Sequence, residues 1–142
     1  MAKLQVELVT AEGRVLSQEA DFVLAPGLGG ELGVLPRHIP LLTPLKTGEV
    51  MVRNDGEEVF LFVAGGFLEV LPDKVVILAD AAERADEIDE ARAQAARKAA
   101  EEALASNETD AAAAARLERA VFRIRVAELR RRRHGGSRPP SQ

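Results

Sequence analysis

From residue 4 to residue 80, short apolar segments alternate with turns at the spacing of β-strands. Leu4, Val6 and Leu8 alternate with polar residues, as in a strand that buries one face. Two strand-like segments flank Asn54-Asp55-Gly56, which is typical of a hairpin turn, and residues 75–78 form a fully apolar strand. Further turns are expected at Pro26-Gly27, Gly29-Gly30, Gly65-Gly66 and residues 71–74. About nine or ten such strands predict an antiparallel sandwich or barrel.

After Ala82 the pattern changes to that of α-helices. The first helix is expected to carry an apolar stripe of Ile88, Ala91, Ala95, Ala99 and Ala103, with Leu104 beside it. Ser106 to Asp110 is a loop with good N-cap residues for a second helix. That helix is predicted from about Ala111 to Arg132, and its apolar side carries Leu117, Val121, Ile124 and Ala127. Gly135-Gly136 is expected to end it, before a disordered tail from Ser137 to Gln142.

The predicted organisation is therefore a β domain over residues 1–84, a helix-turn-helix over 85–134 and a disordered tail over 135–142. Alanine favours helix formation, but a stripe of alanines buries little apolar area. The two helices can therefore form locally and still dock weakly on the rest of the chain. The alternative interpretation is a permanently docked alanine-rich hairpin.

The charge is distributed unevenly. The chain has a net charge of −4, yet residues 111–142 carry nine arginines against two glutamates. At 100° per residue, four of these arginines fall within about 60° of one another on the second helix, namely Arg116, Arg119, Arg123 and Arg130. Such a stripe is either a solvated face or a surface for an anionic partner.

Several classes of chemistry are excluded by composition. The 142-residue chain has no cysteine, and its two histidines are His38 and His134, so a His/Cys metal site is not available. It lacks a Walker-type phosphate loop, a nucleophile elbow and a membrane-spanning apolar run. We therefore expect no metal, no catalytic residue and no enzymatic activity of this chain alone.

One short motif, DEIDEARA over residues 86–93, combines a carboxylate and a guanidinium at the start of the first helix. Asp89 and Arg92 are three residues apart and so share a helix face. Together they can accept a hydrogen bond from an amino group and donate to a phosphate, as nucleotide binding requires. Taken alone, such a pair is more often only a solvated face.

Four further segments resemble a known family. Residues 30–42 read GELGVLPRHIPLL, residues 65–70 read GGFLEV, and Asp73-Lys74-Val75 and residues 80–85 follow. Their order, and both helices up to Leu129, resemble the epsilon subunit of bacterial F-type ATP synthases. Relatives usually have glycine before the histidine, where this chain has Arg37.

The resemblance implies a ten-stranded antiparallel β-sandwich followed by a two-helix hairpin, on the rotating central stalk of a proton-translocating synthase. The expected partners are the gamma subunit, the c ring and the alpha and beta catalytic subunits, at the cytoplasmic face of the bacterial cell membrane. Membrane association would occur only through the complex. The hairpin would fold down on the sandwich or extend and inhibit ATP hydrolysis.

The resemblance also assigns roles to individual residues. Glu31 and His38 would face the c ring. ATP, as a regulatory ligand of the folded hairpin, would be held by Glu83, Ile88, Asp89, Arg92, Ala93, Arg119 and Arg123. The catalytic beta subunits would meet the stripe of Arg116, Arg119, Arg123 and Arg130.

Two other functions fit the residues less well. The run Arg130 to Arg133 suggests salt-dependent nucleic-acid binding. The chain is acidic overall and lacks Tyr and Trp, however, so it supplies few groups for stacking on bases, and no nucleic-acid partner is expected. The other alternative, a free-standing ATP sensor, would bind ATP without the stalk subunits.

Overall fold

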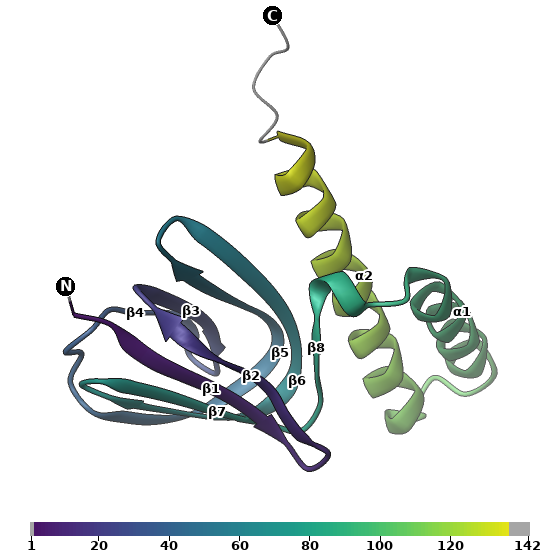
Figure 1. Cartoon of the computed structure of the whole chain (residues 1–142). Coiled ribbons are helices and arrows are strands. Elements are labelled where there is room, and N and C mark those ends of the chain that lie inside the picture. Colours follow the sequence, from purple (N-terminus) through teal and green to yellow (C-terminus); the bar gives the residue numbers. More distant parts are fainter. Residues whose placement is uncertain (1, 137–142) are drawn as a thin grey trace, which may run out of the picture. The chain divides into compact units, whose positions relative to one another are not determined.

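The strands of residues 4–84 form one hydrogen-bonded sheet, which curls over to enclose its own core (Figure 1). The structure is a computed structural model that describes residues 2–136, with side chains through residue 130. Its strands are β1 Leu4–Thr10, β2 Gly13–Ala20, β3 Phe22–Gly27, β4 Gly30–Val34, β5 Leu41–Asn54, β6 Glu57–Leu71, β7 Lys74–Ala79 and β8 Ala82–Arg84. Their order in the sheet is β2-β1-β7-β6-β5-β3-β4, and β8 pairs with β6.

This sheet corrects the expected ten antiparallel strands. The described residues contain eight strands, and the sheet is mixed because β1 and β7 run parallel. The expected turn at Gly65-Gly66 is wrong, since β6 passes through both glycines while it stays paired with β5 in one register. At Gly66 the φ angle is 127°, and a Cβ there would lie 2.0 Å from the carbonyl oxygen of Leu78. The glycines therefore bend one long strand and let β7 come close, instead of reversing the chain.

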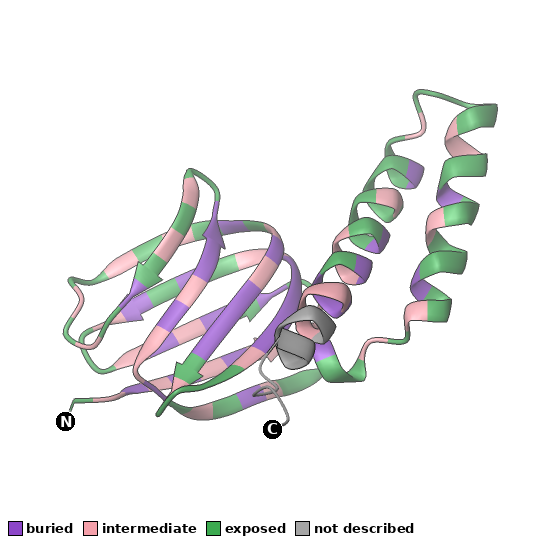
Figure 2. Cartoon of the chain, turned by 90° about the horizontal axis from the view of Figure 1, so that it is seen from above, coloured by how far each residue is buried: buried purple, intermediate pink, exposed green. Residues whose placement is uncertain are grey.

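The core of the sandwich consists of aliphatic side chains at alternate strand positions (Figure 2). Along β1 the alternation is strict, with Leu4, Val6 and Leu8 buried between partly exposed neighbours. Strand β6 adds Leu61, Val63, Leu68 and Val70, and β7 adds Val75 and Ile77. No buried polar or charged residue occurs among the described residues, so this core is held together by apolar packing.

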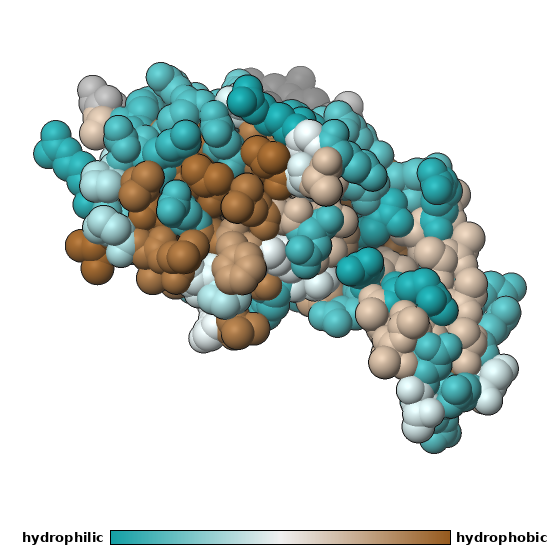
Figure 3. Space-filling view, turned by 90° about the horizontal axis from the view of Figure 1, so that it is seen from below, coloured by the Kyte–Doolittle hydropathy of each residue, from teal (hydrophilic) through white to brown (hydrophobic). Residues whose placement is uncertain are grey.

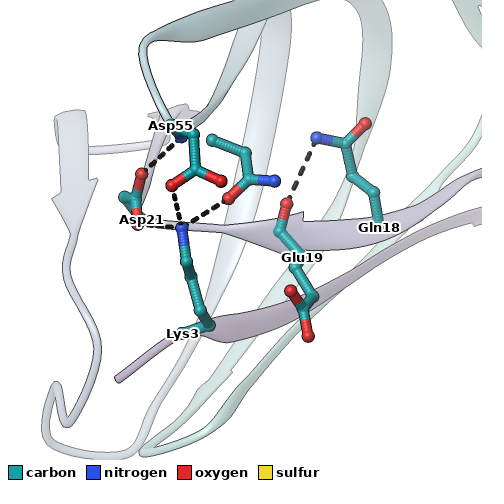
Figure 4. Close-up of polar contacts among 6 residues, drawn as sticks. Lys3, Gln18, Glu19, Asp21 and Asp55 are labelled. Atoms are coloured by element: carbon teal, nitrogen blue, oxygen red, sulfur yellow. Dashed lines mark hydrogen bonds and ion pairs between the residues drawn. The ribbon is translucent and has the colours of Figure 1, made fainter. Parts of the chain in front are cut away.

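The β5–β6 turn confirms the predicted hairpin, and a polar cluster ties it to the N-terminal segment. Asp55 and Gly56 both have positive φ, at 52° and 82°, as a two-residue hairpin turn of this type requires. Lys3 Nζ lies 2.5 Å from Asp21 Oδ1, 2.7 Å from Asn54 Oδ1 and 2.8 Å from Asp55 Oδ1. The backbone N–H of Asp55 donates to Asp21 Oδ2 at 2.7 Å (Figure 4). We call these four residues the Lys3 cluster.

Hydrogen bonding inside the Lys3 cluster shifts two pKa values. The bonds from Lys3 and from the Asp55 N–H lower the pKa of Asp21, because they favour its charged form. The bonds to Asp21 and Asp55 raise the pKa of Lys3 for the same reason. The cluster is therefore complete only while both carboxylates and the ammonium group are charged.

Residues from Ala85 on form a second compact unit, separate from the unit Met1–Arg84. It contains a 3₁₀ turn η1 Ala85–Glu87, helix α1 Glu90–Ser106 and helix α2 Ala111–Gly136. Asp110 caps α2 by accepting from the N–H of Ala113 at 2.9 Å, as its position in the predicted loop led us to expect. We call the two parts the sandwich unit and the helical unit.

Helix α2 ends later than expected, because it continues through Gly136. Glycine costs about 1 kcal/mol relative to alanine inside a helix, but it does not forbid the helical conformation. From residue 137 on, the predicted disordered tail lies outside the described residues.

Helices α1 and α2 pack against each other through a different alanine face from the one expected. The buried residues of α1 are Ala93 and Ala100, whereas Ala91, Ala95 and Ala99 are exposed. On α2, Ala113, Ala120, Ile124 and Ala127 are buried, but Val121 from the expected stripe is 43% exposed. Alanine occurs on every side of α1, so its spacing alone could not identify the face that α2 covers.

Candidate functional site

The motif at the start of α1 is partly used by the helix itself. Asp89 is the N-cap residue of α1, and its Oδ1 accepts the backbone N–H of Arg92 at 3.1 Å. The helix is thereby stabilised at an end whose N–H groups otherwise lack partners. The motif therefore fixes where α1 begins, and any ligand of Asp89 would share its carboxylate with the cap.

The other residues expected to hold a nucleotide differ in accessibility. Arg92 and Arg119 are exposed, Ile88 and Arg123 are half-buried, and Ala93 is completely buried. Glu83 belongs to the sandwich unit, where it pairs with Phe62 of β6. The remaining six residues all belong to the helical unit.

Helical geometry brings the arginines to one side of the helix pair. On α2, Arg116, Arg119, Arg123 and Arg130 lie about 90° round the helix from its buried stripe. On α1, Arg92 is rotated away from the buried stripe by a similar angle and in the same rotational direction. Because the two helices run antiparallel (Figure 1), this rotation places Arg92 on the same side of the helix pair as the α2 arginines. The 3₁₀ turn that precedes α1 contacts α2, so Arg92 lies beside the later turns of α2. The helical unit therefore presents a basic side, which Arg92 shares with the stripe on α2.

Strand β4 and the loop that follows it each contain one residue that the resemblance assigns to a partner. Glu31 is exposed on β4, which is an edge strand of the sheet. His38 is half-buried, and its Nδ1 lies 2.7 Å from the carbonyl oxygen of Ile39. Beside it, Arg37 has a φ angle of 67°, a left-handed conformation that glycine adopts far more easily. The Arg37 N–H donates to the carbonyl oxygen of Pro72 at 2.7 Å and so holds this loop against the β6–β7 turn.

Sequence reasoning missed an exposed apolar surface on the sandwich unit. The cross-strand row Pro44, Phe67 and Leu78 is exposed on neighbouring strands, and Leu42 lies two residues from Pro44 on the same face. The exposed large apolar side chains of this unit are Leu28, Leu35, Ile39, Leu42, Phe67 and Leu78, and we call them the apolar face. Figure 3 shows apolar side chains gathered over this unit.

The sequence contained a signal for this surface. The pairs Leu41-Leu42, Phe67-Leu68 and Ile77-Leu78 place apolar residues on both sides of a strand. One member of each pair enters or borders the core, and the other has no place in it. Contiguous exposed apolar surfaces of this kind mark interaction sites.

Within the part of the chain that has described side chains, no group of three or more His, Cys, Asp or Glu residues could hold a metal ion. No helix there combines the length and the apolar composition needed to cross a membrane. An apolar sheet face and an arginine-lined helix pair are the prominent surfaces.

The architecture defines a class of protein: a β-sandwich followed by a helical hairpin. The family description "ATP synthase, Delta/Epsilon chain" matches almost the whole chain, with its beta-sandwich domain at residues 3–85 and its long alpha-helix domain at residues 86–128. The chain therefore belongs to the delta/epsilon chain family of ATP synthases, and it groups with the epsilon chains.

Individual relatives support this assignment. The ATP synthase epsilon chain of Dehalococcoides mccartyi strain BAV1 is 52% identical over 136 residues, which cover 93% of this chain and 97% of the relative. That of Herpetosiphon aurantiacus is 53% identical over 133 residues, covering 92% and 98%. A chain in the cryo-EM structure of the Euglena gracilis mitochondrial ATP synthase has a similar fold, with a TM-score of 0.67, 24% identity and coverage of 94% and 82%.

Proposed function

We propose that this chain is the central-stalk epsilon subunit of a proton-translocating F-type ATP synthase. It takes part in ATP synthesis coupled to proton transport, and it inhibits ATP hydrolysis through its helical unit. The observation that carries the proposal is the apolar face, an exposed surface on the unit whose sequence matches the family domain. The chain would lie peripherally at the cytoplasmic face of the cell membrane, attached only through the complex.

In this proposal the sandwich unit attaches the chain to the rotor. The strand residues Leu42, Phe67 and Leu78 of the apolar face would contact the gamma subunit. The β4–β5 region, with Glu31 and His38, would contact the c ring. Gel filtration with the gamma subunit tests the attachment. The wild-type chain should co-elute with gamma, and a Leu42→Ser, Phe67→Ser variant should not. Val121→Ser is the matched control, because Val121 is an exposed apolar residue of the helical unit. Equal co-elution of all three proteins would refute this use of the face.

The helical unit would act as the inhibitory element. Its arginine stripe can form charge-assisted contacts with acidic surfaces of the catalytic beta subunits, each worth about 1–3 kcal/mol when well formed. Replacing Arg116, Arg119, Arg123 and Arg130 with alanine should therefore relieve inhibition of ATP hydrolysis and reduce its salt dependence. Arg125→Ala is the control, since Arg125 is exposed on another side of the same helix. Undiminished inhibition by the quadruple variant would show that the stripe is only a solvated face.

ATP would act as the regulatory ligand of the hairpin. The arrangement of Arg92, Arg119 and Arg123 on one side of the helix pair supports this part, because guanidinium groups match phosphate oxygens well. Two features limit how the other residues could take part: Asp89 is engaged as the N-cap, and Ala93 is buried. Arg92 and the two α2 arginines would therefore hold the phosphates, with Ile88 beside the base.

A ligand that binds only the folded hairpin stabilises it by about 2.7 kcal/mol at a hundredfold excess over its Kd. The hairpin would stay folded while ATP is plentiful and would extend to block hydrolysis when ATP falls. Isothermal titration of the full chain with ATP tests this switch. We expect binding by the wild type and by Arg125→Ala, and weakened binding by an Arg92→Ala, Arg123→Ala variant. No heat at millimolar ATP, or equal binding by all three proteins, would leave a purely mechanical inhibitor.

A further inference from the structure

A single carboxylate interrupts the apolar sheet surface of the sandwich unit. Glu69 is exposed on β6, where it pairs across the sheet with Leu42 of β5 on one side and Val76 of β7 on the other. Two residues before it on the same face is Phe67, whose own cross-strand partners are Pro44 and Leu78. The immediate neighbours of Glu69 on this face are therefore apolar, and the charged residues Glu7 and Lys74 lie beyond Val76.

Glu69 has no hydrogen bond or ion pair with any described residue. The neighbouring cations of the sheet are already engaged elsewhere, because Lys74 Nζ lies 3.6 Å from Glu7 Oε2 and Arg14 lies 3.9 Å from Glu7 Oε1. The sheet thus neutralises Glu7 with two cations and leaves Glu69, in the same cross-strand row on the other side of Val76, without any. Water solvates the carboxylate while the face is uncovered.

A partner that covers the apolar face removes this water. A buried carboxylate without a counterion is strongly unfavourable, so an apolar surface alone would be a poor fit at this position. A partner that presents a guanidinium or ammonium group there would instead satisfy the carboxylate and fix the register of the contact. The face thus favours apolar partners that carry one cation and disfavours purely apolar surfaces, including a second copy docked through uncharged residues.

We infer that Glu69 is the specificity-determining residue of the apolar face, and that the gamma subunit places an arginine or lysine side chain against it. This inference rests on the proposed attachment to gamma, and it adds the charge that the partner surface must carry. The apolar residues supply most of the buried area, and Glu69 selects which apolar surface docks and in which orientation.

Binding of the full chain to purified gamma subunit, measured by biolayer interferometry at low and high salt, tests the inference. Glu69→Gln keeps the side-chain shape and removes the charge, and it should weaken binding about 30-fold or more. Glu69→Lys should abolish detectable binding, and reversal of one Arg or Lys of gamma to Glu should restore it. Glu57→Gln is the matched control, because Glu57 is exposed at the start of the same strand, away from the apolar face.

The alternative outcomes are distinct. If Glu69→Gln and Glu69→Leu bind gamma as tightly as the wild type, or more tightly, no cation faces Glu69 and the inference is wrong while the attachment stands. If the wild-type chain does not bind gamma at all, the proposed attachment fails and the inference fails with it. Thermal unfolding followed by circular dichroism should show that all variants are folded, since Glu69 makes no contact on which the fold depends.

Discussion

The two units of this chain bury very different side chains. The fully buried residues of the sandwich unit are large and aliphatic, such as Leu4, Leu61, Leu68 and Ile77. The helical unit buries chiefly methyl groups, at Ala93, Ala100, Ala113 and Ala120. Because apolar burial contributes about 25 cal/mol per Å², the helix pair gains far less from packing than the sandwich does. The helical unit is therefore the one that can change its packing at a small cost in free energy.

Hydrogen bonding also indicates that the helical unit can change its packing more easily than the sandwich unit. A helix satisfies its backbone N–H and C=O groups internally, whereas a strand needs its neighbours. The α1 and α2 helices can therefore separate without exposing unpaired backbone groups along their length. Separating strands of the sandwich would disrupt the apolar core and would also break the backbone hydrogen bonds between strands. A binding free energy of a few kcal/mol can thus shift the helical unit while the sandwich stays intact.

The largest expected effect comes from Gly66 in the sandwich unit. Gly66→Ala would place a Cβ 2.0 Å from the Leu78 carbonyl oxygen and would strain a φ angle of 127°. Because the steric overlap and the backbone strain both destabilise the fold, we expect a loss of about 4 kcal/mol or more in the free energy of unfolding, measured in urea. At Gly56, φ is also positive but nothing lies within 4 Å of a Cβ. Gly56→Ala should therefore cost about 1 kcal/mol, and equal losses would contradict the close approach of β6 and β7.

A pair of truncations compares the two cores directly. Leu68→Ala should reduce the stability of the sandwich by about 2–5 kcal/mol, because it removes a completely buried side chain. Ala100→Gly, at an equally buried position of α1, should cost about 1 kcal/mol. Urea unfolding followed residue by residue by NMR would resolve the two units. If Ala100→Gly cost as much as Leu68→Ala, the weak packing of the helical unit would be refuted.

A smaller effect is expected from the β4–β5 loop. Arg37→Gly should raise the free energy of unfolding by up to about 1 kcal/mol, because it relieves the left-handed backbone at φ 67°. Arg37→Ala removes the same charge without that relief, and it should give no gain. If Arg37→Gly and Arg37→Ala were equally stable in urea titrations, any change in stability would come from loss of the Arg37 side chain and not from relief of the backbone.

The smallest effect concerns the Lys3 cluster, whose groups are accessible to solvent. Its pKa shifts define a pH window of stabilisation. Because the folded-state pKa of Asp21 is lowered, its contribution is complete above the unfolded value of about 3.9 and is lost as pH falls further. Because the pKa of Lys3 is raised, its contribution is complete below about 10.4 and is lost as pH rises through the folded-state value.

Asp21→Asn should therefore lower the melting temperature at pH 7 and change it little near pH 2. Asp73→Asn serves as the control, because the Asp73 side chain makes no hydrogen bond or ion pair with any described residue and only its backbone carbonyl is used, by Gln5. A melting-temperature difference between wild type and Asp21→Asn that persists unchanged to pH 2 would show that the Lys3 cluster does not stabilise through charge.

The sequence by itself determined the features that depend on neighbours along the chain. The hairpin turn at Asp55-Gly56, the change from strand to helix spacing near Ala82 and the cap at Asp110 were all readable, because each rests on local backbone chemistry. Helix spacing likewise placed the α2 arginines in one stripe. The identity of that stripe's partner, and ATP binding, remain predictions. The role of Asp89 as N-cap was not predicted, since Asp89 was placed within the first helical turn.

Only the tertiary structure decided the features that depend on distant contacts. Gly65-Gly66 has the composition of a turn, and the β7 backbone pressed against it makes it a bend within a strand. Alanine carries no preference for one helix face, so packing alone selected Ala93 and Ala100. Strand pairing brought Leu42, Phe67 and Leu78 from three strands onto one surface, with Glu69 among them. A linear pattern records which residues alternate, whereas strand register determines which of them lie side by side.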